Sequence, residues 1–132
     1  MADVRWIELS VFADPRGVLT AAESGKELPF ELKRAYWLSQ IAGERGNHAH
    51  REAELVQVAV AGSFRVEVTD GRESRSFKLK SPRRGLYIPP GVWVHLTDAS
   101  PDARALILAS TPFDEAKVMR DWEEYLRLPG PP

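Results

Sequence analysis

Residues 64–79 read FRVEVTDGRESRSFKL and have the pattern of two antiparallel strands joined by a short turn. The apolar residues alternate with polar ones on both sides of the turn: Phe64, Val66, Val68, Phe77 and Leu79. This alternation gives each strand one apolar and one polar face. The pair Asp70-Gly71 suits the positive φ angles of a primed two-residue turn. The stretch therefore predicts a tight β-hairpin.

The remaining segments extend the same pattern along the chain. Further short apolar segments are separated by turn signals and predict strands near residues 4–9, 18–22, 34–41, 55–61 and 106–109. Residues 55–61 are almost wholly apolar, which is typical of a strand buried on both faces. Only residues 118–126 have helical spacing, and Asp114 is a candidate cap for that helix. Many short strands with one helix at the end favour an all-β sandwich or barrel.

Composition restricts the class of protein. The 132 residues fit one domain spanning 1–132. Lys and Arg number 18 against 19 Asp and Glu, and this balance offers no basic field for nucleic acid. No apolar run is long enough to span a membrane, and the N-terminal residues lack the features of a secretion signal. Because the chain has no cysteine, it has neither disulfides nor thiolate metal sites, and we expect it in the cytoplasm.

The residues with the clearest chemical potential are His48 and His50. Residues two apart in a strand project from the same face, so the two imidazoles would face either the barrel interior or solvent together. Facing inward, they would form a titratable pair near neutral pH, where imidazole is an effective proton carrier. The alternative is that both are ordinary surface or core residues, and the spacing alone does not decide between these interpretations.

A metal site is a second interpretation of the same residues. His48, His50 and Glu54 have the spacing HxHxxxE, and His95 could supply a third imidazole to iron, manganese or zinc. However, His95 follows Pro89-Pro90-Gly91 by one residue more than such a site expects. A shift of one residue turns a strand side chain to the opposite face, so we do not expect a metal cofactor.

Several motifs follow one another along nearly the whole chain: Asp14-x-Arg16-Gly17-x-Leu19, Lys33-Arg34-x-Tyr36, Arg45-Gly46-x-His48-Ala49-His50 with Glu54, residues 85–93 (GLYIPPGVW), and residues 119–126. Together they resemble the sugar 3,4-ketoisomerases, cupins that act on dTDP-4-keto-6-deoxyglucose. The resemblance implies a small cupin-type β-barrel, or jelly roll, with a short C-terminal helix. It also implies a homodimer, often with exchanged N-terminal strands, and a metal-independent site without a cofactor.

The resemblance also implies roles for individual residues. His48, His50 and Tyr36 match the catalytic residues, and Arg16 matches a substrate-facing position whose arginine favours the 3-keto-6-deoxy-galacto product. The other candidate substrate contacts are Arg45, His95, Trp93 and Glu54. Arg16 and Arg45 would bind pyrophosphate or sugar oxygens, because a guanidinium can bind phosphate bidentately. Glu54 would hydrogen-bond a histidine or lie at a strand edge, and Trp93 would line the pocket or pack in the core. Both arginines could instead be exposed turn residues.

The implied reaction moves a carbonyl from C4 to C3 of the dTDP-linked sugar through an enediol. We expect His50 to act as the base at C3, His48 to orient the substrate, and Tyr36 to relay a proton between the oxygens. Three alternatives remain open at this stage. They are a nucleotide-sugar 3,5-epimerase, a metal-dependent cupin enzyme and a non-catalytic sugar-binding barrel.

Overall fold

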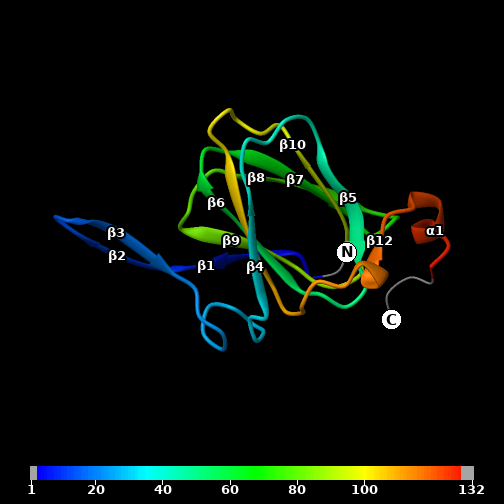
Figure 1. Cartoon of the computed structure of the whole chain (residues 1–132), viewed down its shortest axis with the longest axis horizontal. Helices are drawn as coiled ribbons and strands as arrows, with labels where there is room; N and C mark the ends of the chain where they lie inside the picture. Colours follow the sequence, from blue (N-terminus) through cyan, green and yellow to red (C-terminus); the bar gives the residue numbers. More distant parts are fainter. Residues whose placement is uncertain (1–2, 129–132) are drawn as a thin grey trace.

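The computed structural model describes residues 3–128, which form two five-stranded antiparallel sheets packed face to face (Figure 1). The first sheet has the order β1-β9-β6-β11-β4: Arg5–Glu8, Arg84–Ile88, Leu55–Ala61, Arg104–Ala109 and Arg34–Leu38. The second has the order β12-β5-β10-β7-β8: Val118–Met119, Arg45–His50, Trp93–Thr97, Phe64–Thr69 and Ser74–Leu79. The predicted all-β, cupin-type barrel is confirmed.

The core lies between the two sheets and uses the alternation seen in the sequence. Phe64, Val66 and Val68 of β7 are at most 1% exposed and point inward. The strand β6 is buried on both faces, as its composition predicted. Its residues Val56 and Val58 point to the outer side of the first sheet and belong to a second apolar cluster. Leu28 and Phe30, from the segment between β3 and β4, complete this cluster.

The predicted hairpin forms, but its turn is longer than expected. Thr69 pairs with Ser74, so the loop between β7 and β8 contains four residues rather than two. The Asp70 side chain accepts hydrogen bonds from the backbone N–H groups of Arg72 and Glu73 at 2.9 Å each. These bonds close a wider loop, which is a common use of aspartate in turns and competes with the primed two-residue turn.

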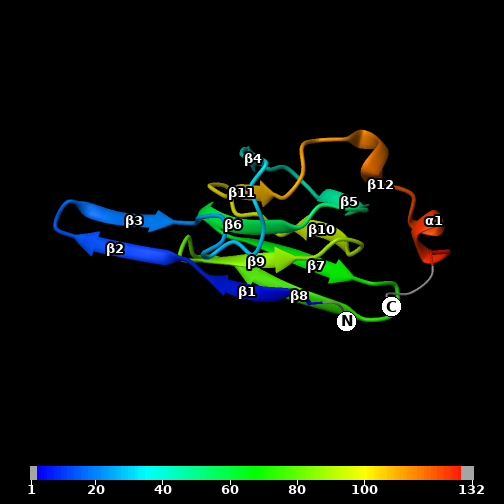
Figure 2. The same cartoon turned by 90° about the horizontal axis from the view of Figure 1, so that it is seen from below.

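A second hairpin extends away from the barrel. It consists of β2 (Ser10–Asp14) and β3 (Gly17–Ala21), and both views show it projecting from the end opposite β5 and β12 (Figures 1 and 2). Three of its apolar side chains are between 57% and 60% exposed: Phe12, Val18 and Leu19. The hairpin therefore contributes no side chain to the core between the sheets.

The C-terminal segment differs from the single helix that the spacing predicted. Asp114 caps a short 3-10 turn, η1 (Glu115–Lys117), and Val118 belongs to the strand β12, which pairs with β5. The helix α1 (Trp122–Leu126) begins later and is capped by Asp121, whose carboxylate accepts from two backbone N–H groups. Neither helix within residues 3–128 has the length and apolarity that crossing a membrane requires.

Candidate active site

His48 and His50 lie on the inner face of β5 and contact each other. Their Nε2 atoms are 3.1 Å apart, and the rings meet edge to face with centroids 4.8 Å apart. Between them, Ala49 points outward into a separate cluster with Trp93. The two-residue spacing therefore places both imidazoles on one face, as strand geometry requires. At 3.1 Å, one Nε2 donates a hydrogen bond and the other accepts it.

The pair opens into a cavity of about 640 Å³ formed by β4, β5 and the segment around β12. Tyr36 and Arg34 enter it from β4, and Arg45 enters it from the start of β5. Leu38, Phe113 and Val118 supply apolar walls. The cavity is therefore large enough for a sugar ring and has polar groups on several sides.

Arginines give this cavity a positive character. Arg34, Arg45 and Arg120 all line it, and Glu44 is the acidic residue among the lining side chains. The Arg34 guanidinium lies over the rings of Tyr36 at 4.9 Å and Phe113 at 5.4 Å, which holds it against the cavity wall. Such a set of guanidinium groups is suited to binding phosphate oxygens.

The electrostatic environment keeps both histidines neutral at physiological pH. Burial, followed by the neighbouring His48 and the charges of Arg34 and Arg120, lowers the pKa of His50 to about 4. Burial also lowers the pKa of His48 below its ordinary value. For Tyr36, burial raises the pKa, so its hydroxyl remains protonated. The site thus combines neutral imidazoles, which accept protons, with a phenol that donates one.

Comparison with known proteins identifies the family. The family model FdtA, described as WxcM-like, C-terminal, matches residues 2–129. The chain belongs to this family. A curated member, the TDP-4-oxo-6-deoxy-alpha-D-glucose-3,4-oxoisomerase of Aneurinibacillus thermoaerophilus, is 39% identical over 121 residues, covering 90% of this chain and 87% of the relative.

Solved structures of FdtA-like relatives have the same fold. A 3,4-ketoisomerase from Helicobacter canadensis is 36% identical, with a TM-score of 0.93 over 96% of this chain and 97% of the relative. A histidine-to-asparagine variant of the 3,4-ketoisomerase QdtA from Thermoanaerobacterium thermosaccharolyticum was solved in complex with TDP-4-keto-6-deoxyglucose. It is 30% identical, with a TM-score of 0.92 over 96% of this chain and 93% of the relative. The resemblance predicted from the sequence is confirmed.

The structure of this FdtA-like chain brings together four of the predicted site residues. His48, His50, Tyr36 and Arg45 line one cavity. Two further lining arginines, Arg34 and Arg120, had no role in the sequence-based prediction. Arg34 could have been found from strand alternation, because it lies two residues before Tyr36 and so shares its face. Arg120 follows β12, and only the pairing of β12 with β5 brings it to the cavity.

Trp93 and His95 lie on the opposite face of the second sheet. Both line a separate cavity of about 780 Å³ on its outer surface. Between them, Val94 is buried in the core and pairs with His48 across the strands. His95 Nε2 lies 3.4 Å from a Glu44 carboxylate oxygen. Neither Trp93 nor His95 is brought to the histidine pair.

Glu54 and Arg16 also lie away from the histidines. Glu54 accepts a hydrogen bond from the Tyr87 hydroxyl at 2.6 Å, and the bond joins it to the first sheet rather than to an imidazole. Arg16 stands at the tip of the projecting hairpin, with its side chain 90% exposed and paired with Asp14 at 2.7 Å. In a single chain, Arg16 does not reach the cavity.

The donor groups do not fit the alternative metal site. Within residues 3–128, no group of three or more His, Asp or Glu side chains is arranged to hold a metal ion. His95 faces the outer cavity, and the carboxylate of Glu54 is bonded to Tyr87. The sequence spacing HxHxxxE therefore does not bring its own carboxylate to the two imidazoles.

Proposed function

We propose that this protein is a sugar 3,4-ketoisomerase acting on TDP-4-keto-6-deoxyglucose. The observation that carries the proposal is the pair of neutral imidazoles, with Nε2 atoms 3.1 Å apart, facing a cavity lined by arginines and Tyr36. This arrangement supplies a proton carrier and an anion-binding wall in one site. The activities named for the relatives support the same reaction.

In the proposed mechanism, His50 takes the proton from C3 of the bound sugar. The electrons of that C–H bond form the C3=C4 double bond, and O4 becomes an enolate oxygen that gains a proton from Tyr36. The O3 hydroxyl then returns a proton to Tyr36 as the C3 carbonyl forms, and His50 delivers its proton to C4. Every proton is conserved, so no oxidant, reductant or cofactor is consumed. His48 holds His50 in place through the bond between their Nε2 atoms.

The arginines have two functions in this proposal. Arg34, Arg45 and Arg120 bind the diphosphate of the nucleotide sugar, which anchors the sugar beside the histidines. The charges of Arg34 and Arg120 also oppose protonation of His50. The bound diphosphate would offset those charges and raise the pKa of His50, which makes it a stronger base when substrate is present.

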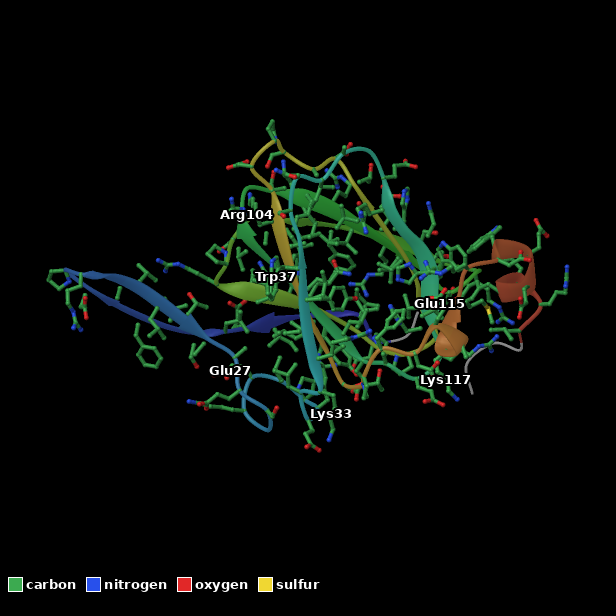
Figure 3. All side chains as sticks on the ribbon, viewed as in Figure 1. Glu27, Lys33, Trp37, Arg104, Glu115 and Lys117 are labelled. Carbon is green, nitrogen blue, oxygen red and sulfur yellow. The ribbon has the colours of Figure 1, made fainter. Side chains whose placement is uncertain are left out.

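We propose that the active form is a homodimer, with the 3-keto-6-deoxy-galacto sugar as product. The hairpin exposes Phe12, Val18 and Leu19, and Trp37 is 68% exposed. Figure 3 labels Trp37 on β4. Packing the hairpin against a second copy would bury this apolar surface. It would also carry Arg16 to the partner's cavity, where the family resemblance favours the galacto product.

The decisive experiment is NMR of the product made from TDP-4-keto-6-deoxyglucose in D₂O. Transfer of the carbonyl from C4 to C3 supports the proposal, whether C4 carries the original proton or deuterium from exchange at His50. The H4–H5 coupling constant of product made in H₂O reports the configuration at C4. Deuterium at C5 would instead identify an epimerase. Recovery of unchanged substrate bound to folded protein would indicate a non-catalytic barrel.

A further inference from the structure

The ion pair between Glu115 and Arg120 lies at the edge of the candidate active site. Glu115 belongs to η1, whereas Arg120 follows β12, so the pair ties together the two ends of this segment. Arg120 Nε donates to Glu115 Oε1 at 2.6 Å, and Nη2 donates to Oε2 at 3.0 Å. Figure 3 shows Glu115 beside β5, the strand that carries the histidines.

The geometry of this pair leaves part of the Arg120 guanidinium unused by Glu115. A guanidinium presents five N–H groups in one plane, in an arrangement that matches carboxylates and phosphates bidentately. Glu115 takes the edge formed by Nε and Nη2. The edge formed by Nη1 and the second hydrogen of Nη2 can therefore bind another anion without breaking the ion pair.

The position of Arg120 indicates which anion this is. Arg120 lines the same cavity as Arg34, Arg45 and both histidines, and it also borders the outer cavity that Trp93 and His95 line. Its charge also opposes protonation of His48 and His50, which places it within electrostatic range of the reacting groups. An anion bound to the free edge of Arg120 would lie next to the sugar ring without being part of it. The diphosphate of a nucleotide sugar occupies such a position relative to its sugar.

We propose that Glu115 is a positioning residue that fixes the Arg120 guanidinium so that its free edge faces the diphosphate of the substrate. This inference rests on the proposed function and extends it to a residue that does not touch the substrate. Both side chains are more than half exposed, at 54% and 58%, so Arg120 without its partner would sample many rotamers. Glu115 removes that freedom before the substrate binds.

A role for Glu115 in repelling the diphosphate would predict the opposite effect on affinity. If Glu115 were only a negative charge near an anion site, replacing it with glutamine would remove repulsion and tighten binding of the diphosphate. If Glu115 positions Arg120, the same change weakens binding of the diphosphate. Without Glu115, the Arg120 side chain is ordered only when the diphosphate binds, and the loss of its conformational entropy then reduces the affinity. The sign of the change in affinity therefore separates the two roles.

The experiment is calorimetric titration of TDP into the wild type, Glu115→Gln, Arg120→Met and the double variant. We expect Glu115→Gln to raise the Kd by about two- to five-fold, the scale of an exposed ion pair, and to raise KM with kcat unchanged. In the Arg120→Met background, Glu115→Gln should have no further effect, because Glu115 acts through Arg120. Glu124→Gln is the matched control, since Glu124 accepts from Arg51 at 3.3 Å on the outer surface.

Each result bears on the inference. Thermal unfolding of every variant establishes that the fold is kept, and Glu124→Gln should bind TDP as the wild type does. Unchanged or tighter TDP binding by Glu115→Gln would overturn the inference. So would an equal loss of TDP affinity when Glu115→Gln is made in the Arg120→Met background, because Glu115 would then act without Arg120. If the wild type neither binds TDP nor converts the substrate, the proposed function itself fails, which is a different outcome.

Discussion

The pH dependence of kcat/KM is a direct test of the His50 environment. This ratio reports ionisations of the free enzyme, and His50 must be neutral to take a proton. Its pKa is lowered to about 4. At pH 5 about 90% of such a group is neutral, compared with about 3% for an imidazole of ordinary pKa. We therefore expect kcat/KM to stay level down to about pH 5 and to fall tenfold per unit below about pH 4.

The assay follows conversion of TDP-4-keto-6-deoxyglucose by NMR in buffers from about pH 3 to 8 at constant ionic strength. The variant Arg34→Met provides a second test. The charge of Arg34 opposes protonation of His50, so removing that charge should move the acidic limb of kcat/KM to higher pH. The absolute rate also falls in that variant, so the position of the limb is the measurement. An acidic limb near pH 6.5 in the wild type would refute the reasoning.

The same burial makes folding stability depend on pH, so circular dichroism must accompany each rate. The folded-state pKa of His50 lies below that of the unfolded chain, and the unfolded state therefore binds more protons between the two values. The contribution of His50 to stability is fully present above about pH 6.5 and is lost as the pH falls through about 4. Rates are interpreted only where the spectrum stays native.

Three further predictions concern single substitutions. His50→Asn should lower kcat by about 10²- to 10⁴-fold while TDP still binds, and a variant that keeps a tenth of the wild-type rate would remove His50 from the role of base. Gly46→Ala should destabilise the fold by about 1–3 kcal/mol in denaturant titration, because Gly46 has φ +89° and an added Cβ would lie 2.9 Å from the Val94 carbonyl oxygen. Wild-type stability would contradict that contact. Tyr87→Phe should cost about 1–2 kcal/mol of stability by leaving Glu54 without its 2.6 Å hydrogen bond. The kcat/KM of this variant should stay within about twofold of the wild-type value. A large loss of activity would indicate that Glu54 takes part in the reaction.

The fold could be predicted from the sequence wherever alternation and burial agree. The strand β6 has an apolar residue at almost every position, and the structure buries both of its faces. The β7–β8 hairpin was equally clear, although its turn was not. Asp70-Gly71 is compatible with two loops, and the hydrogen bonds from Arg72 and Glu73 to the Asp70 carboxylate select the longer one.

The C-terminal segment could not be predicted because its decisive contact is not local. The spacing of its apolar residues is helical, but Val118 and Met119 pair with β5 across the sheet. Because of that pairing, the helix begins at Trp122 and not at Val118, where the helical spacing starts. The pairing also places Arg120 at the cavity of the two histidines. Helical propensity over so few residues is weak, so tertiary pairing determines the conformation.

His95 lies outside the inner cavity because it follows the inward-facing Val94 in β10, and its pairing with β7 is regular. The pairing of β5 with β10 shifts register between Val94 and His95, where Asn47, with φ 59°, is the extra residue. His48 lies opposite Val94 and faces the interior, whereas His95 projects outward beside Trp93. Because strand side chains alternate, rotamer changes alone cannot bring His95 to the inner face. All three histidines lie within residues 3–128, and two of them line the inner cavity while the third lines the outer one. This favours proton transfer by the histidine pair over a three-histidine metal shell.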